Sequence, residues 1–500
     1  MNHWPTTAGR LETRNIGVSG VCCLALLSLL GEDKVFLPGS AGYNASLSSY
    51  FSQQESQVYP RCIVSPASTE DVSKAVRSLS STAAARWEAE GGDLDHRDET
   101  GSGCLFAVRS GGHAGFAGAA NVRGGVTIDL RRLSRIEVYS KLDQLGLGVA
   151  GGRAAQVGVG GLVTGGGISY ASPRFGFSCD TVSSYQVVLA DGAIVEASNQ
   201  QDADLAFALR GGSNNFGIVT RVVMQTFEQA GPIWGGSVYY SITTVDDQLK
   251  AFVDISAANS YDEYSSLITS FGFASGQGTA VVNSIEYTKV GEANPPVFAP
   301  LMAIPSLLST MRLDSMTNIS IEQGAFSPDG RRQLSVVTTH ASTLAMLNAT
   351  YINYNRSLAA VEQVADMVWS ISLDPLPPAI YARPQSQANA LGLAGRSTGA
   401  TLVVAQLSAS WTDASDDDAV EQAARDLFEA IERDARALDA YDPFRYLNYA
   451  APWQDPIASY GPESVQRLRE IRRRVDPRGV FPRQVPGGFK IPKQAVELES

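Results

Sequence analysis

The chain has 500 residues, of which 44% are hydrophobic, so its length suggests two or three domains rather than one core. Its formal net charge of -12 argues against nucleic acid and against an anionic membrane surface, because both select clustered Lys and Arg. We therefore expect a small-molecule partner. Separately, we expect the protein to be a monomer.

The first distinctive segment is the apolar run VSGVCCLALLSLL, at residues 18–30. It has the length of a signal-peptide apolar region and is too short to span a bilayer, but no strongly basic start precedes it. A short buried helix of the mature protein is therefore an equal alternative. Secretion as a glycoprotein is favoured by four N-x-S/T sequons, although such triplets also occur by chance; they lie at Asn44, Asn318, Asn348 and Asn355.

The cysteines and the next elements indicate a globular domain without a metal site. Five cysteines form no C-x-x-C pair and no zinc-like spacing, so we expect no metal. A helix is predicted to begin near Thr69, because Ser68 stands three residues before Asp71 as in a capping arrangement. After a polar loop at residues 91–103, the segment CLFAVRSGGH predicts a buried strand that ends in a glycine turn.

Further along the chain, turn signals and helical stripes indicate a mixed α+β fold. Asp191-Gly192 between two apolar runs predicts a tight hairpin that needs positive backbone angles. From Gly231 the glycine density falls, and alternating strands and helices suggest a second domain. A helix after three aspartates at 416–418 is predicted to bury one stripe, and another helix begins at Pro462; the stripe is Val420, Ala424, Leu427, Ile431 and Leu438.

Three glycine-rich segments are predicted to hold a dinucleotide. They are the first loop Arg109–Gly115, the second loop Gly151–Val182 and the third loop Arg210–Thr220. Any one of them is most simply a turn between strands. Together they would let the backbone approach a pyrophosphate closely. No Rossmann fingerprint is present, since Val163 occupies the last glycine position of the run G-V-G-G-L-V. The sequence also contains no P-loop motif G-x-x-x-x-G-K-[ST].

The order and content of these loops resemble the FAD-linked oxidases of the vanillyl-alcohol oxidase superfamily, berberine-bridge-enzyme-like branch. The resemblance rests on RSGGH, VGVGGLVTGGGISY, FGFSCDTV and RGGSNNFGIVT, and on the closing segments FRYLNYAAPWQ and VDPRGVFPRQVPGGFK. It implies an N-terminal segment at residues 1–42 and a PCMH-type FAD-binding domain at 43–230. A substrate domain at 231–440, with an antiparallel sheet covered by helices, and a returning C-terminal segment at 441–500 would follow.

The resemblance also implies the residues that bind FAD. His113 takes the position whose ring nitrogen is bonded to the flavin 8α carbon in this family, and Ala154 stands where some members carry a second, cysteine attachment. A single covalent link is therefore expected. The remaining cofactor-binding residues expected are Arg109, Ser110, Gly111, Gly112, Ala114, Gly158, Gly161, Gly165, Gly166, Gly167, Asp180, Gly217, Ile218, Val219 and Asn448.

The reactive side of the flavin is predicted to face the segment YLNY. Asn448 would contact the flavin, Tyr449 would be the catalytic base and Tyr446 would line the same cavity. A free phenol has a pKa of ~10, so Tyr449 needs a cation or the flavin to favour its phenolate. Core packing is the alternative for both tyrosines. Related enzymes sometimes use Glu or Asp from the substrate domain, and no such residue can be placed from the sequence.

The predicted function is an FAD-dependent oxidoreductase. It would take a hydride from a small alcohol, amine, sugar or secondary metabolite to flavin N5 and pass electrons to O2. One departure from the family is large: Val138 runs straight into YSKLDQLGLGVAGGR, where a strand, a turn and a helix start are expected. This keeps open a noncatalytic flavin-binding or ligand-binding secreted glycoprotein, a defective paralogue.

Overall fold

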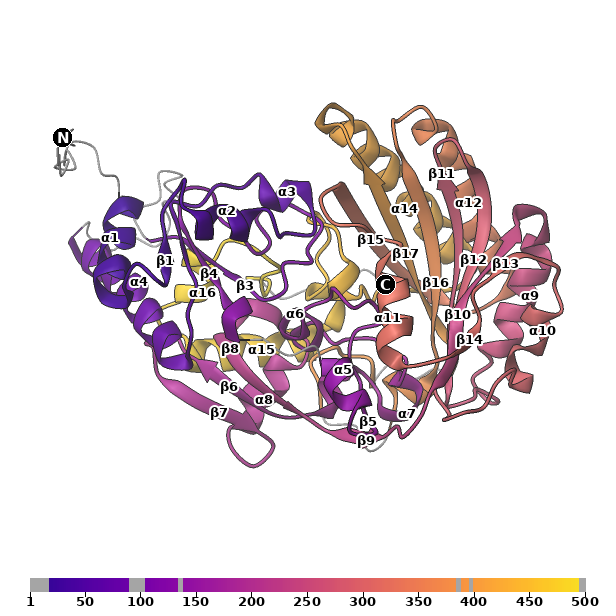
Figure 1. Cartoon of the computed structure of the whole chain (residues 1–500), viewed down its shortest axis with the longest axis horizontal. Coiled ribbons are helices and arrows are strands. Elements are labelled where there is room, and N and C mark those ends of the chain that lie inside the picture. Colours follow the sequence, from indigo (N-terminus) through magenta and orange to yellow (C-terminus); the bar gives the residue numbers. More distant parts are fainter. Residues whose placement is uncertain (1–17, 90–103, 134–137, 384–387, 395–398, 494–500) are drawn as a thin grey trace, which may run out of the picture.

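The computed structural model describes residues 18–89, 104–133, 138–383, 388–394 and 399–493. Its helices and strands form two bodies that lie side by side (Figure 1). One body is built from the N-terminal part of the chain and the C-terminal segment, and the other from a large antiparallel sheet with helices on its outer face. The predicted polar loop at 91–103 lies outside the described residues.

The N-terminal layer is a four-stranded sheet in the order β1-β2-β4-β3. β2 and β3 run parallel to β4, and β1 is antiparallel to β2. The helix predicted near Thr69 and the strand before the first glycine loop are both present. The elements are α1 (Val18–Leu30), β1 (Val35–Phe36), α2 (Ala41–Leu47), α3 (Gln53–Ser56), β2 (Cys62–Val64), α4 (Thr69–Ala89), β3 (Phe106–Arg109), β4 (Val126–Asp129) and η1 (Leu130–Leu133).

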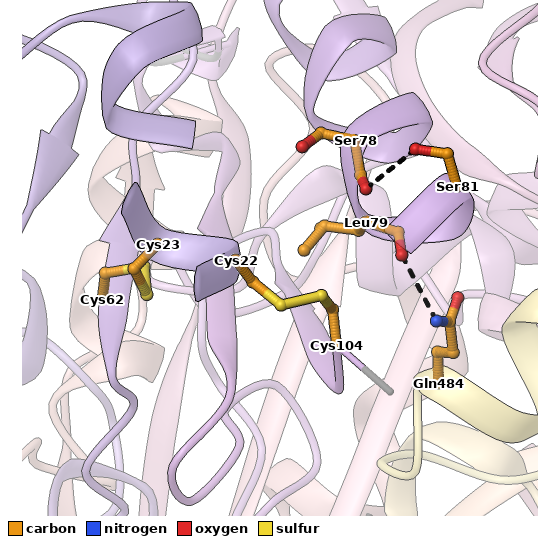
Figure 2. Close-up of a disulfide and its surroundings, with 8 residues drawn as sticks. All are labelled: Cys22, Cys23, Cys62, Ser78, Leu79, Ser81, Cys104 and Gln484. Atoms are coloured by element: carbon orange, nitrogen blue, oxygen red, sulfur yellow. Dashed lines mark hydrogen bonds between the residues drawn. A yellow bond between two sulfur atoms is a disulfide. The ribbon is translucent and has the colours of Figure 1, made fainter. Parts of the chain in front are cut away.

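Two disulfides tie α1 to this sheet (Figure 2). Cys22 is bonded to Cys104, just before β3, and Cys23 is bonded to Cys62 in β2. The apolar run at residues 18–30 is thus a helix anchored in the domain. Cys179 is a free, buried thiol. Figure 2 also shows the C-terminal segment joining this layer, where Gln484 donates a hydrogen bond to the Leu79 carbonyl oxygen of α4.

The next layer carries the second and third glycine loops. An antiparallel sheet in the order β7-β6-β8 contains the predicted hairpin, in which Gly192 has a φ of +80°. Asp191 does not have a positive φ, so the glycine alone supplies the turn geometry. A separate β5-β9 pair follows α5. The bounds are α5 (Val138–Asp143), β5 (Leu147–Val149), α6 (Val159–Thr164), α7 (Ser172–Phe175), η2 (Ser178–Thr181), β6 (Val182–Val188), β7 (Ile194–Ser198), α8 (Ala203–Leu209), η3 (Ser213–Asn215), β8 (Ile218–Met224) and β9 (Thr226–Glu228).

The large sheet has nine strands in the order β13-β10-β12-β11-β16-β17-β15-β18, with β14 also paired to β10. Its strands are β10 (Ile233–Ser241), β11 (Ser265–Ala274), β12 (Gly278–Tyr287), β13 (Ser306–Ser309), β14 (Arg312–Asp314), β15 (Arg332–Ala341), β16 (Val368–Leu376), β17 (Leu402–Trp411) and β18 (Tyr441–Asp442). β18 is an edge strand of this sheet and pairs with β15.

Helices pack on both faces of this sheet. Their bounds are η4 (Ile242–Thr244), α9 (Val245–Ile255), η5 (Pro296–Phe298), α10 (Ala299–Met302), α11 (Met316–Gly324), α12 (Leu344–Val361), α13 (Pro378–Tyr381), η7 (Ala414–Asp416) and α14 (Asp417–Ala437). The helices α9, α10, α12 and α14 cover the outer, apolar face, whereas α11 lies on the opposite side against β10 and α5, and α13 packs against α7. α14 buries four of the five predicted stripe residues. Leu438 is 45% exposed, because the helix ends one residue earlier and Leu438 is its C-cap, so that part of the prediction is wrong.

The two faces of the large sheet differ in chemistry. Successive side chains in a strand point to opposite faces. In β16, Ile371 and Leu373 are fully buried in the helix-covered core, whereas Ser372 and Asp374 lie on the other face. We call this second face the polar sheet face; it comprises Ser270, Glu286, Ser335, Ser372, Asp374 and Gln406, which the strand registers align. Hydroxyl pairs such as Ser270–Ser372, at 2.8 Å, cross it.

The C-terminal segment returns to the first body, where α15 (Pro462–Val475) and α16 (Val480–Gln484) pack. Between them and β18 lie η8 (Leu447–Tyr449) and η9 (Ala458–Tyr460). Leu468 and Ile471 of α15 share a core with Phe207 and Leu209 of α8. The segment YLNY is therefore carried on a stretch that runs from the large sheet to the glycine loops.

Candidate active site

The first and second glycine loops touch through their backbones. A Cβ atom added to Gly111 would lie 2.8 Å from the Gly158 Cα, and one added to Gly158 would lie 2.5 Å from the Gly111 nitrogen. A Cβ on Gly160 would similarly lie 2.6 Å from the Ser110 hydroxyl oxygen. Gly111 and Gly158 meet backbone atoms at these separations, so a larger residue at either position would force the two loops apart.

The first loop is held from beneath by Arg109. Its guanidinium, which is fully buried, donates to the carbonyl oxygens of Ser46 and Ser49 at 2.6 Å each and stacks over the Tyr50 ring at 3.6 Å. A Cβ on Gly112 would lie 2.6 Å from this guanidinium. Arg109 therefore supports the loop from the side of α2, rather than presenting its own charge at the loop surface.

His113 stacks on Phe51. The two ring centroids are 4.0 Å apart with an angle of 23° between the planes, and the Phe51 amide donates to the Gly112 carbonyl oxygen at 3.1 Å. Burial lowers the pKa of His113 to about 4, so the imidazole is neutral near pH 7. The next residue, Ala114, accepts a hydrogen bond through its carbonyl oxygen from the Ser52 hydroxyl. A flat, uncharged ring is thus fixed at the end of the loop.

Tyr446 and Asn448 lie against the second loop. The Tyr446 hydroxyl accepts hydrogen bonds from the amides of Gly167 and Ile168, both at 3.0 Å, and from the Asn448 side-chain amide at 3.1 Å. A Cβ on Gly165 would lie 2.1 Å from the Asn448 Oδ1. The structure therefore brings YLNY to the run Gly165–Gly167, and it gives Tyr446 the role of fixing this glycine turn.

Tyr449 lies where the glycine loops meet the large sheet. The guanidinium of Arg153, in the second loop, donates to the Tyr449 hydroxyl and to the Asp374 carboxylate at 2.6 Å each. The Tyr449 carbonyl oxygen accepts from the Ser335 hydroxyl, which in turn accepts from Gln406. Residues of the two bodies thus converge on this one phenol.

The charge balance at Tyr449 is set by burial and by its two charged neighbours. Burial raises the pKa of Tyr449, the Arg153 guanidinium acts to lower it, and the Asp374 carboxylate acts to raise it. The net effect is to raise the pKa of Tyr449. The predicted cation is present as Arg153, but burial and Asp374 outweigh its lowering effect. Arg153 is the partner that favours the phenolate.

Glu286 adds a second titratable group to the same layer. It is fully buried on the polar sheet face, and its Oε1 accepts a hydrogen bond from Ser284 at 2.6 Å, while its Oε2 has no partner among the described residues. Burial raises its pKa to about 8, against a lowering effect of Arg153. Gly235 on the neighbouring strand makes room for it, because a Cβ there would lie 3.2 Å from the Glu286 Cγ.

Other predicted cofactor residues occupy varied surroundings. Gly161 is exposed with open space around it, whereas Gly217 packs against β6, where a Cβ would lie 2.4 Å from Val187. Ile218 and Val219 begin β8, with Ile218 buried in the N-terminal core. The Asp180 carboxylate accepts from the Phe177 amide and from Asn389, and its pKa is raised to about 6 by burial.

Sequence reasoning did not find Arg153, Asp374 or Glu286. Arg153 stands inside the GGR motif of the second loop, and its charge next to two glycines was a usable signal. Asp374 and Glu286 are single acidic residues within strands, and their place in the site becomes evident only from the sheet face on which each lies. The described residues contain no group of three or more His, Cys, Asp or Glu that could hold a metal ion. None of the helices in the described ranges has the length and apolarity that crossing a membrane requires.

These residues fit FAD. The glycine loops form a cradle that a Cβ would fill, and a neutral His lies at the end of the first loop. Glycine backbone without side chains can approach a diphosphate closely. A family model described as an FAD binding domain matches residues 100–198. The fold and this site together define a flavin-dependent oxidoreductase.

Comparison with curated proteins places the chain more closely. The FAD-dependent monooxygenase CTB5 of Cercospora beticola is 34% identical over 96% of this chain and 93% of its own length. The FAD-dependent monooxygenase sdcF of Emericella nidulans is 33% identical over 95% of this chain and 99% of its own. The chain therefore belongs to this family of FAD-dependent monooxygenases and is an FAD-linked oxidoreductase. A protein named oligopeptidase PhomG' from Diaporthe leptostromiformis is 43% identical over 94% of this chain, which spans only 37% of that longer protein.

Solved structures share the fold. 6-hydroxy-D-nicotine oxidase from Arthrobacter nicotinovorans superposes with a TM-score of 0.72 at 20% identity, over 92% of this chain and 98% of its own. A variant of berberine bridge enzyme in complex with (S)-reticuline gives 0.72 at 17% identity, over 95% and 100%. The predicted α+β fold, a PCMH-type FAD-binding domain with a helix-covered antiparallel substrate sheet, is confirmed.

Proposed function

We propose that the protein oxidises a small alcohol, amine, sugar or secondary metabolite at a carbon atom and passes the electrons to O2. When bound, FAD supplies the two-electron acceptor for the C–H bond that is broken. The observation that carries the proposal is the position of Tyr449. Arg153, in the second glycine loop, donates both to the Tyr449 hydroxyl and to the Asp374 carboxylate of the polar sheet face. A proton acceptor at this junction can serve a substrate lying on the polar sheet face.

In this proposal the chain's own residues divide the work. Tyr449, in its phenolate form, accepts the substrate's proton and becomes a neutral phenol, and the Arg153 guanidinium stabilises the phenolate before that transfer. Tyr446 and Asn448 keep the turn at Gly165–Gly167 in place. Because burial raises the pKa of Tyr449, the ionised acceptor becomes populated only toward alkaline pH. The rate of substrate oxidation should therefore rise with pH.

His113 is the proposed point of covalent flavin attachment. Support comes from its neutral imidazole, whose free ring nitrogen can form a bond, and from its fixed stacking on Phe51. Acid-precipitated protein should retain the yellow flavin absorption, and His113→Ala should release all its flavin on denaturation while binding some FAD in the folded state. Wild-type protein that loses all FAD on denaturation would contradict this attachment.

Secretion as a glycoprotein is also proposed. All four sequon asparagines, Asn44, Asn318, Asn348 and Asn355, are exposed, and the two disulfides of α1 suit an oxidising compartment. Enzymatic removal of N-glycans from protein made in the native host should lower its mass. An unchanged mass would contradict glycosylation.

A substrate screen without oxygen tests the central reaction. Purified protein should bleach when one candidate substrate is added alone, and admission of O2 should restore the colour with peroxide release. A second candidate, monooxygenation, is favoured by the names of the relatives, and it predicts transfer of labelled oxygen from O2 to the product. Colour that no substrate bleaches would favour a flavin-binding protein without catalysis and refute the proposed reaction.

A further inference from the structure

Lys490 occupies an unusual position near the end of the chain. The segment Gly487–Ile491 is clamped by the third glycine loop: Asn214 donates to the Gly487 carbonyl oxygen and Asn215 to the Phe489 carbonyl oxygen, both at 3.0 Å. The Lys490 ammonium donates to the Asn214 Oδ1 at 2.9 Å. The lysine is thereby fixed at the surface of the third loop.

The same segment also touches the chain that follows the first glycine loop. A Cβ on Gly487 would lie 1.9 Å from the Gly118 carbonyl oxygen, and the Phe489 ring meets the Phe116 ring edge-on at 5.8 Å between centroids. Phe116 is three residues after His113. The segment that carries Lys490 therefore contacts both the third glycine loop and the stretch that follows the first.

The ammonium of Lys490 has no anionic partner within the described part of the chain. Its one hydrogen bond there goes to a neutral amide oxygen, and it makes no ion pair. The side chain is only partly exposed, and burial lowers its pKa to about 7. Keeping a cation in such surroundings is costly unless an anion comes to it.

We propose that the Lys490 ammonium binds the diphosphate of FAD, as a charged donor beside the backbone amides of the glycine loops. The inference rests on the FAD site described above. A diphosphate would supply the negative charge that Lys490 lacks as a partner, and the segment that carries the lysine contacts the third glycine loop and the stretch after the first. Hydrogen bonds between charged partners are stronger than those between neutral ones.

Reversible FAD binding to a His113→Ala background tests the proposal. Titration followed by flavin fluorescence should show that Lys490→Met weakens FAD binding by on the order of 10- to 100-fold, because a charged hydrogen bond is lost. Lys490→Arg should retain most of the affinity. Lys493→Met is the matched control, since Lys493 is exposed three residues away, and it should bind FAD as the background does.

Two further probes separate the diphosphate from the rest of the cofactor. Riboflavin, which has no phosphate, should bind equally to the background and to Lys490→Met, and inorganic pyrophosphate should compete with FAD only when Lys490 is present. Asn214→Asp, which gives the ammonium a carboxylate partner, should also weaken FAD binding. This variant covers the case in which Lys490→Met fails to fold.

Three outcomes would overturn the inference. The first is FAD affinity in Lys490→Met within about twofold of the background. The second is an equal loss of FAD and riboflavin binding, which indicates a packing role, and the third is unchanged affinity in Asn214→Asp. Failure of the background itself to bind FAD would refute the FAD site as a whole, a result distinct from failure of Lys490 alone.

Discussion

The two bodies that meet at Tyr449 build their functional surfaces by opposite means. The glycine-loop body uses backbone, in that Gly111 and Gly158 approach so closely that neither tolerates a Cβ. The large sheet uses side chains, in that Ser372, Asp374 and their neighbours project from alternate positions of regular strands. Backbone surfaces suit the invariant parts of a dinucleotide, whereas an array of side chains can be changed singly to suit a substrate.

The largest effect is expected where the two surfaces meet. Tyr449→Phe should lower the rate constant of flavin reduction at saturating substrate by about 100- to 10,000-fold, because the proposed proton acceptor is removed. Substrate affinity should fall by only ~1 kcal/mol, the value of one hydrogen bond. Stopped-flow spectroscopy without oxygen, with a substrate found in the screen, measures both quantities.

Glu286 offers the matched comparison for this variant. Glu286→Gln keeps the shape of a buried titratable side chain on the polar sheet face, one of whose carboxylate oxygens has no hydrogen-bond partner among the described residues. If Tyr449 is the proton acceptor, the rate constant of flavin reduction should be far higher in Glu286→Gln than in Tyr449→Phe. The reverse order would assign the role of proton acceptor to the Glu286 carboxyl group.

A pair of glycine substitutions compares the two bodies directly. Gly111→Ala should destabilise the fold by about 3 kcal/mol and weaken FAD binding, because its Cβ would lie 2.8 Å from the backbone of Gly158. Gly272→Ala, in β11, should be neutral or stabilising by about 0.5 kcal/mol, since its Cβ would meet only the Ser370 hydroxyl at 3.6 Å. Thermal unfolding and FAD titration provide the measurements, and equal effects at the two sites would contradict the contrast.

A smaller effect is expected from Tyr446→Phe. The hydroxyl accepts from the amides of Gly167 and Ile168, so its removal leaves two buried donors without a partner. Stability should fall by about 1 to 3 kcal/mol, while the intrinsic reduction rate in folded protein should change much less than in Tyr449→Phe. Chemical denaturation measures the loss of stability. A large kinetic effect at unchanged stability would instead assign Tyr446 to the chemistry.

The difference between the bodies also explains what the sequence could predict. Positions that require glycine produce a recognisable spacing of glycines in the sequence. The strand before the first loop, the hairpin at Gly192 and the glycine loops could therefore be predicted from the sequence. The contact of YLNY with Gly165–Gly167 was anticipated only through the family resemblance. The vicinal bridges from Cys22 and Cys23 were not predicted, because spacing does not determine pairing.

The site residues of the large sheet could not be found in the same way. Asp374 and Glu286 are isolated acids in strands, and their meaning depends on which face of the sheet each occupies and on which strands are neighbours. β11 and β16 are adjacent in the sheet although β12, β13, β14, α11, β15 and α12 lie between them in the chain. Such long-range register is set by tertiary packing, which residue order alone does not specify.

The pH dependence of flavin reduction tests most directly the claim that Arg153 and Asp374 tune Tyr449 as the acceptor. The Asp374 carboxylate acts to raise the pKa of Tyr449, so Asp374→Asn should lower that pKa. Since the ionised phenol is the active form, the rising limb of the reduction rate should move to lower pH in Asp374→Asn and disappear in Tyr449→Phe. A limb that persists in Tyr449→Phe, or that moves to higher pH in Asp374→Asn, would contradict the account.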